Sequence, residues 1–243
     1  MNSYVLLFLA AIVIYMFFKN GKAIFDLRQN KKYIECFNSI KEKGQDAYPE
    51  VITFIENEKN EELIQKATFL KLFLELESDN EEYKKSLDKI DYNVLFYTKN
   101  KINNQKSMFN SDAYIWTIIC MARANKKLKH DVIDSLYEKL DSLQDLKQYL
   151  EANLTIASYK ALKKEDDKGI DFFNALLNGE YTQYKYEKHF IASYKRIAAA
   201  TLAYLNEDMD EYFKDDIKVF AETFVGRTYL SDLGIYDNYK VVE

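Results

Sequence analysis

Glycine and proline, the residues that most often interrupt helices, are scarce in this sequence. Six glycines and one proline occur among 243 residues, far below the roughly 12% that the two make up in average proteins. Turn-rich β-sandwiches and glycine-looped nucleotide folds depend on these residues. With 48% hydrophobic and 30% charged residues, the sequence therefore predicts an all-α protein.

The net charge and the aromatic content exclude further classes of protein. A net charge of −5 argues against nucleic acid as the main partner, because phosphate binding requires a basic face. Sixteen phenylalanines and twenty tyrosines are too many for a chain that stays unfolded. Lysine far outnumbers arginine, which is typical of bacteria with AT-rich genomes.

No motif for a cofactor or a metal is present. Neither GxxxxGK[ST] nor GxGxxG occurs, so we expect no nucleotide cradle. The two histidines, His130 and His189, are far apart, and Cys36 and Cys120 lack CxxC spacing. We therefore expect no metal site, no cofactor, and two buried thiols in a reducing compartment.

The first eighteen residues carry no charged side chain. A helix of that length spans about 27 Å, close to the thickness of a thin bilayer core. We expect a transmembrane anchor over residues 1–20, with two alternatives: a signal peptide cleaved after Ala23, and a buried helix of a soluble protein. The residues assigned to the span are Tyr4, Leu7, Ile12 and Phe18, and those assigned to the membrane interface are Lys19, Lys22 and Arg28.

The charges that flank this run predict its orientation. Residues 19–32 carry five basic side chains and one acidic side chain, and basic flanks stay on the cytoplasmic side. We therefore expect the N-terminus outside the cell membrane and the rest of the chain in the cytoplasm. Residues 21–43 would form a basic connecting helix below the membrane.

Apolar residues recur at helical spacing from about residue 30 onward. Tyr33, Ile34, Phe37 and Ile40 predict one helix face, which Gly44 ends. We expect a helical-hairpin domain over 44–225 and a C-terminal tail over 226–243 without a clear helical period. Segment 91–110 has the weakest pattern and could carry a short extra helix. Further helices are predicted over 80–90, 111–126, 130–141, 144–164, 166–178, 184–206 and 208–225.

Small and bulky residues alternate across these hairpins in a recurring way. The sets are Trp116, Ile119, Cys120, Val132 and Leu136; Ile156, Ala157, Gly169 and Phe173; Ile197, Ala200, Thr201, Tyr204, Phe213 and Ile217; and Leu70, Leu74, Tyr83 and Leu87. Over about residues 60–222 the chain resembles degenerate tetratricopeptide-repeat proteins. The resemblance implies an irregular stack of antiparallel helical hairpins with a concave binding surface. The spacing is irregular and the helix-ending proline is missing, so a generic helical bundle is the alternative.

Several carboxylate pairs could suggest acid–base chemistry. Most of them fall near predicted helix starts, where carboxylates cap backbone amides. Lys185, His189 and Ser193 would share a helix face, but nothing supplies an orienting group or an oxyanion hole. We therefore expect no enzymatic activity. The pairs are Asp166-Asp167, Asp215-Asp216, Glu81-Glu82 and Glu207-Asp208.

Two features remain as candidate contact surfaces. Tyrosines, which are favoured at protein interfaces, cluster after the turn at Asn178-Gly179; packing of this turn against its own hairpin is the alternative. A basic turn could touch membrane headgroups or an acidic partner, or could simply be solvated. The tyrosines are Tyr181, Tyr184, Tyr186 and Tyr194, and the basic residues are Arg123, Lys126, Lys127 and Lys129.

These observations predict a membrane-anchored helical-repeat protein that acts as an adaptor or scaffold for an unknown protein or peptide partner at the cytoplasmic face. Tethering would raise its effective concentration near other membrane proteins. Two alternatives belong to other classes. One is an exported or cell-surface helical protein with a signal anchor, and the other is an enzyme whose catalytic carboxylates converge in a deep pocket.

Overall fold

The computed structural model describes residues 31–78, 81–97, 111–164, 167–186, 188–207 and 209–240. In these ranges the chain is helical and contains no strand, only an isolated bridge between Tyr149 and Lys185. The all-α prediction is confirmed. The chain divides into two compact units, Met1–Glu58 and Lys59–Glu243.

The predicted membrane anchor lies outside the described residues. This applies to Tyr4, Leu7, Ile12 and Phe18 in the expected span and to Lys19, Lys22 and Arg28 at its expected interface. Among the residues that the structure does describe, none of the helices has the length and apolar character needed to cross a bilayer.

The described part of the first unit is a pair of helices. A helix over 31–43 is followed by η1 (Gly44–Ala47) and α2 (Tyr48–Asn57). Gly44 has a φ of +57°, the left-handed conformation that ends the first helix as predicted. The predicted apolar face is partly wrong: Tyr33 and Ile40 are buried, but Ile34 is 52% exposed and Cys36 is buried in its place.

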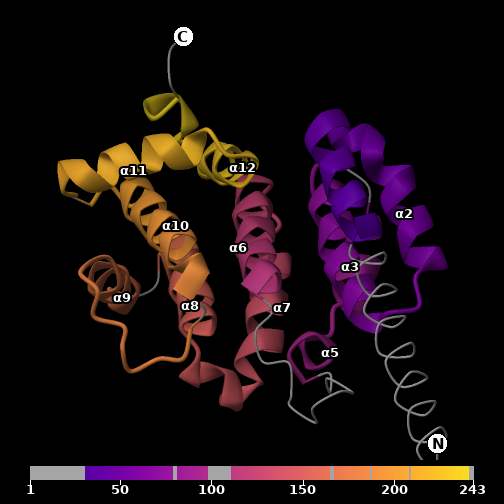
Figure 1. The fold of residues 1–243 in the computed structure, drawn as a ribbon, viewed down its shortest axis with the longest axis horizontal. Coiled ribbons are helices and arrows are strands. Elements are labelled where there is room, and N and C mark those ends of the chain that lie inside the picture. Colours follow the sequence, from indigo (N-terminus) through magenta and orange to yellow (C-terminus); the bar gives the residue numbers. More distant parts are fainter. Residues whose placement is uncertain are drawn as a thin grey trace, which may run out of the picture. The chain divides into compact units, whose positions relative to one another are not determined.

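The second unit is built from helical hairpins (Figure 1). Helix α3 packs against α4, α6 against α7, α8 against α9, and α10 against α11; the first helices of successive hairpins also pack on one another. The elements are α3 (Glu61–Glu75), α4 (Glu82–Lys89), α5 (Tyr92–Tyr97), α6 (Ser111–Lys126), α7 (His130–Asp141), η2 (Gln144–Gln148), α8 (Leu150–Lys163), α9 (Lys168–Leu177), η3 (Lys188–Phe190), α10 (Ile191–Tyr204), α11 (Glu211–Ala221), α12 (Phe224–Leu233) and η4 (Tyr236–Asn238).

Helix α6 is the centre of the second unit. It packs against α3, α7, α8 and α12, and every residue from Trp116 to Ala122 is buried. Seven consecutive residues make about two turns, so all faces of this helix are covered there. The continuous apolar run in its sequence requires this, because a helix that is apolar all round is stable only when it is surrounded.

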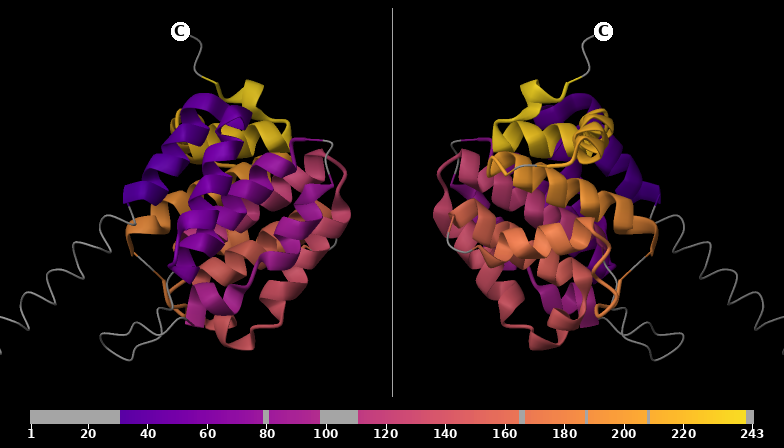
Figure 2. Two further views of the ribbon diagram at one scale, coloured as in Figure 1. Left: turned by 90° about the vertical axis from the view of Figure 1, so that its right-hand side faces the viewer. Right: turned by 90° about the vertical axis from the view of Figure 1, so that its left-hand side faces the viewer.

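The C-terminal segment is helical, contrary to the prediction of an irregular tail. Helix α12 begins at Phe224, before the expected boundary at residue 226. Its Tyr229, Leu230 and Leu233 are buried, so the helix packs against the rest of the second unit. In both views of Figure 2 the yellow α12 lies at the top of the pink and orange helices.

Two predicted helices are interrupted where the chain forms its isolated bridge. The helix expected over 144–164 is divided at Tyr149, and the one expected over 184–206 becomes α10 only at Ile191. The Lys185 amide donates to the Gln148 carbonyl, and the Leu150 amide donates to the Lys185 carbonyl, both at 2.9 Å. This long-range pairing replaces helical hydrogen bonds that local periodicity alone predicts.

Gly226 should be the least replaceable glycine in the second unit. A Cβ at this position would lie 1.9 Å from the Phe220 carbonyl oxygen, whereas a Cβ at Gly169 would lie 3.2 Å from the Ala157 carbonyl oxygen. Gly226→Ala should therefore lower the free energy of unfolding by about 1–3 kcal/mol, the usual cost of overpacking.

Gly169→Ala is the matched control, because both glycines are helical and alanine gains about 1 kcal/mol of helix propensity at each. We expect little net change for this variant. Urea unfolding followed by far-UV circular dichroism measures both. Equal stability of the two variants would contradict the close approach at Gly226.

Candidate functional site

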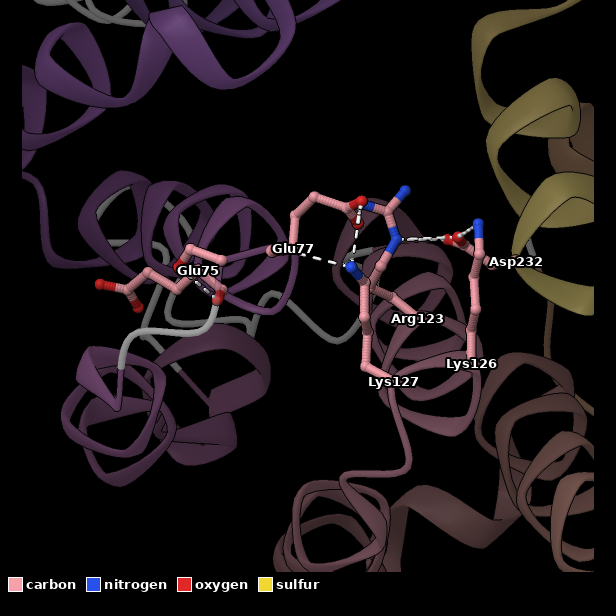
Figure 3. A network of polar contacts seen from close by, with 7 residues as sticks. Glu75, Glu77, Arg123, Lys126, Lys127 and Asp232 are labelled. Atoms are coloured by element: carbon pink, nitrogen blue, oxygen red, sulfur yellow. Dashed lines mark hydrogen bonds and ion pairs between the residues drawn. The ribbon is translucent and has the colours of Figure 1, made fainter.

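Arg123, near the end of α6, joins three helices through a polar network (Figure 3). The Arg123 Nε donates to both carboxylate oxygens of Asp232 on α12 at 2.8 Å. The Arg123 Nη1 donates to the carboxylate of Glu77, just after α3, at 2.6 Å. The guanidinium also lies over the Phe73 ring, 4.3 Å from its centroid. Lys126 reaches Asp232 at 3.4 Å, and Lys127 reaches Glu77 at 3.2 Å.

The charges of this network stabilise the packing of α12 and of the end of α3 on α6. The Asp232 carboxylate is fully buried; burial raises its pKa, and Arg123 and Lys126 offset part of the increase. Burial also acts on Glu77, but Arg123 and Lys127 outweigh it and hold the pKa of that carboxyl below its usual value. Breaking one partner of a buried pair leaves the other charge uncompensated. The network therefore holds α12 against α6.

The basic side chains of the predicted turn thus make contacts within the chain. Arg123, Lys126 and Lys127 pair with carboxylates, and the Lys129 ammonium lies 4.0 Å from the centroid of the Tyr83 ring. The sequence suggested a choice between a solvated turn and a contact surface. Neither alternative anticipated that carboxylates from α12 and the end of α3 meet this turn.

Three of the four candidate tyrosines lie in one turn after α9. Tyr181 and Tyr186 form an edge-to-face pair with ring centroids 5.2 Å apart, and Tyr184 packs edge-on against Phe172 at 6.1 Å. All three tyrosines are half-buried. The backbone amide and carbonyl of Lys185 are both hydrogen-bonded to the junction of η2 and α8, so the backbone that carries the three rings is held in place at Lys185. We call residues 181–186 the tyrosine turn.

Tyr194 does not belong to this surface. It is fully buried on α10, where its hydroxyl donates to the Glu151 carboxylate on α8 at 2.8 Å. The prediction that Tyr194 contacts a partner is therefore wrong. Its place on an apolar stripe of α10, next to Ile197 and Ala198, could have indicated a core position.

Two of the four carboxylate pairs that the sequence singled out form ion pairs, and Asp166 and Asp208 of the other two lie outside the described residues. Glu81 pairs with Lys84, and Glu82 with Lys85 at 2.6 Å. On α11, Asp215 pairs with Lys218 at 2.6 Å and Asp216 with Arg196 at 3.0 Å. The predicted capping role falls instead to Asn60, Asp210 and Thr223, whose side chains accept from backbone amides at helix starts.

A cavity of about 640 Å³ in the first unit is lined by three glutamates, Glu35, Glu50 and Glu58, together with Cys36. Hydrogen bonds from Lys43 and Ser39 hold the pKa of Glu50 below its usual value. Burial, with a contribution from Glu50, raises the pKa of Cys36 to about 11. At neutral pH this cavity therefore holds an ionised Glu50 and a protonated Cys36 thiol.

The predicted Lys185, His189 and Ser193 face does not form. Lys185 lies in the isolated bridge, His189 in η3, and Ser193 in α10, so the three residues do not share one helix. His189 is exposed and lies beside the Phe190 ring. In the part of the chain that the structure describes, no three histidine, cysteine, aspartate or glutamate side chains are arranged so that they could hold one metal ion.

The comparisons with known proteins give no further guide to the site. No family model matches the chain. No curated protein and no solved structure matches it either.

Sequence reasoning missed two features of the second unit. The Arg123–Asp232 pair joins residues 109 positions apart, a separation at which local spacing carries no information. Leu128, in the turn between α6 and α7, is 78% exposed and has a φ of +57°. A leucine between lysines in a predicted turn was the available signal for this second feature.

Replacing Asp232 tests the structural role of the network. Asp232→Ala leaves the Arg123 side chain, which is only 12% exposed, without its main partner. We expect the free energy of unfolding to fall by about 3 kcal/mol, as for other broken buried pairs. Urea unfolding of the full chain measures this change.

Asp237→Ala is the matched control, because Asp237 pairs with Lys240 at the surface. This variant should unfold at the same urea concentration as the unchanged chain. Replacing both partners, as in Arg123→Met with Asp232→Leu, should recover part of the lost stability. A stable Asp232→Ala variant would show that the buried pair does not hold α12 in place.

Proposed function

We propose that this chain is a membrane-anchored helical-hairpin protein that docks another protein at the cytoplasmic face of the membrane. The contact surface would be the tyrosine turn. The observation that carries the proposal is that this turn presents three half-buried tyrosines from a backbone held at Lys185 by two hydrogen bonds, one to the end of η2 and one to the start of α8.

The packing of the hairpins supports a relation to tetratricopeptide repeats. Small residues allow the paired helices to approach closely: Gly169 on α9 lies against the Ala157 carbonyl on α8. Phe173 on α9 is fully buried, at the bulky position that the resemblance assigns to it. The left-handed residues that follow α6, α8 and α10 are Leu128, Lys164 and Asn206, so three successive first helices end in the same way.

The concave side of the stack favours the tyrosine turn over a groove as the docking surface. In repeat proteins of this kind a peptide lies on the first helices of the hairpins. Here Tyr229 of α12 bonds to Thr201 on α10 at 2.9 Å, and its hydroxyl also bonds to Ser158 on α8. Asp232 of α12 is bound to α6. Because α12 covers part of these helices, a partner would bind more easily to the outer surfaces of the hairpins.

Preorganised tyrosines suit such a contact physically. A tyrosine ring contributes a large apolar area and a polar tip at low cost in side-chain entropy. The Lys195 ammonium, 5.9 Å from the Tyr181 ring centroid, donates to the Leu177 carbonyl at 2.8 Å and fixes the turn to the end of α9. Less ordering is then required on binding, which favours affinity.

Site-specific photo-crosslinking tests the contact surface. A photo-reactive residue at the exposed Thr182 in the full chain should give a defined protein adduct in cells. Combined Tyr184→Ala and Tyr186→Ala should reduce the yield of this adduct about tenfold, because truncating central aromatic contacts typically costs that much affinity. Immunoblotting of the adduct measures the yield.

Tyr212 provides the matched control, because it is 72% exposed on α11, outside the tyrosine turn. Tyr212→Ala should leave the adduct unchanged, and circular dichroism should confirm that the Tyr184 and Tyr186 variant is folded. If every crosslink survives the double replacement, the tyrosine turn is not the contact surface.

A topology test examines the proposed side of the membrane. Asn206→Cys places a thiol at an exposed turn, whereas Cys36 and Cys120 are buried. A membrane-impermeant maleimide should label this variant only after the cells are opened, because the second unit would be cytoplasmic. Labelling in intact cells would favour the exported alternative instead.

A further inference from the structure

Leu128 occupies a position where an apolar side chain is unfavourable in two ways. It follows the end of α6 in the left-handed conformation, with a φ of +57°. The Leu128 amide donates to the Asn125 carbonyl at 3.1 Å and the Lys129 amide to the Ala124 carbonyl at 2.9 Å, the Schellman pattern in which glycine or asparagine is preferred. The side chain is also 78% exposed to solvent.

The other left-handed residues of the described chain show what this conformation ordinarily selects. They are Gly44, Lys164, Gly179, Asn206 and Gly234, which are glycines or polar residues. Leu128 is the apolar exception among them, and it is the most exposed of the large hydrophobic residues that the structure describes. No packing within the chain compensates a side chain that is this exposed, so a contact outside the chain would account for it.

Lys126 and Lys127, beside Leu128, are not the sole partners of the carboxylates that they contact. Arg123 alone contacts both Glu77 and Asp232, so each carboxylate keeps a partner if Lys126 or Lys127 turns away. The Lys126 side chain is 44% exposed and its contact with Asp232 is long, 3.4 Å. Lys129, which follows Leu128 in the sequence, lies over the Tyr83 ring.

The charge balance at this tip is positive although the chain as a whole is acidic. Arg123, Lys126 and Lys127 pair with Glu77 and Asp232, and Lys129 is followed by Asp131 in the first turn of α7. Glu81, which also interacts electrostatically with Lys129, is paired with Lys84. Four cations against three carboxylates leave a positive tip in a chain with a net charge of −5.

We propose that the tip between α6 and α7, residues 126–129, rests on an anionic lipid surface, with Leu128 inserted at the headgroup level and Lys126 and Lys127 directed to lipid phosphates. An exposed apolar side chain among lysines is the pattern of interfacial membrane contacts. The inference rests on the proposed membrane anchor, which keeps the tip close to lipid. It adds a second contact, which would orient the second unit on the membrane.

An environment-sensitive fluorophore at the tip tests this proposal. The full chain carrying Leu128→Cys is labelled with a nitrobenzoxadiazole maleimide and reconstituted into vesicles of phosphatidylcholine, with or without phosphatidylglycerol. Cys36 and Cys120 are buried and do not compete for the label. We expect a blue shift and a several-fold rise in emission on the vesicles, larger when phosphatidylglycerol is present.

Asn206→Cys is the matched control, because residue 206 has the same left-handed conformation in the turn after α10. Its label should keep the emission that it has in water. Combining Leu128→Cys with Lys126→Gln and Lys127→Gln should abolish the extra response to phosphatidylglycerol, while Arg123 continues to hold both carboxylates.

The outcomes separate this inference from the proposed anchor. Flotation of the unlabelled chain with the vesicles reports the anchor alone, and a chain that does not float contradicts the anchor and this inference together. If the chain floats but the label at 128 behaves like the label at 206, the tip inference is overturned and the anchor stands. A response to phosphatidylglycerol that survives both lysine replacements would also overturn the headgroup contact.

Discussion

The second unit depends on the need to surround α6. Residues Trp116 to Ala122 are apolar or small and all are buried, so no face of this helix can meet water. Its hairpin partner α7 covers one side, α3 and α8 come from the two adjacent hairpins, and the fourth neighbour, α12, comes from the C-terminal end of the chain. A stack of hairpins alone would leave one side of α6 open. The C-terminal helix therefore belongs to the core and not to a tail.

Two threonine hydroxyls on the inner helices are buried and hydrogen-bonded. Thr117 and Thr201 each donate to the carbonyl four residues earlier, at 2.8 and 2.7 Å, which satisfies a buried hydroxyl within its own helix. The same oxygens also meet the hydroxyls of Tyr92 and Tyr229, and burial raises the pKa of Tyr229 to about 12. These short side chains thus join helices that are far apart in the sequence.

Helical periodicity in the sequence predicted those helices whose bounds depend on local interactions. The bounds of α6 and α7, 111–126 and 130–141, follow from helical periodicity. Periodicity failed where long-range contacts decide, as at the Tyr149–Lys185 bridge and in α12. For the same reason, the tyrosine turn could be noticed in the sequence, but not its fixation to α8 or the burial of Tyr194. The basic turn was noticed too, whereas its carboxylate partners lie 46 and 109 residues away.

The position of α12 bears on how the surface can act. Because α12 is bonded to α6, α8 and α10 through Asp232 and Tyr229, displacing it would expose a buried carboxylate and two turns of α6, and this cost is large relative to the stability of a domain. A partner is therefore accommodated more easily at sites that require no such opening. The tyrosine turn and the Leu128 tip both meet this condition, since their side chains already face solvent. If the proposed docking function holds, the packing that completes the core would direct a partner to the turns between helices.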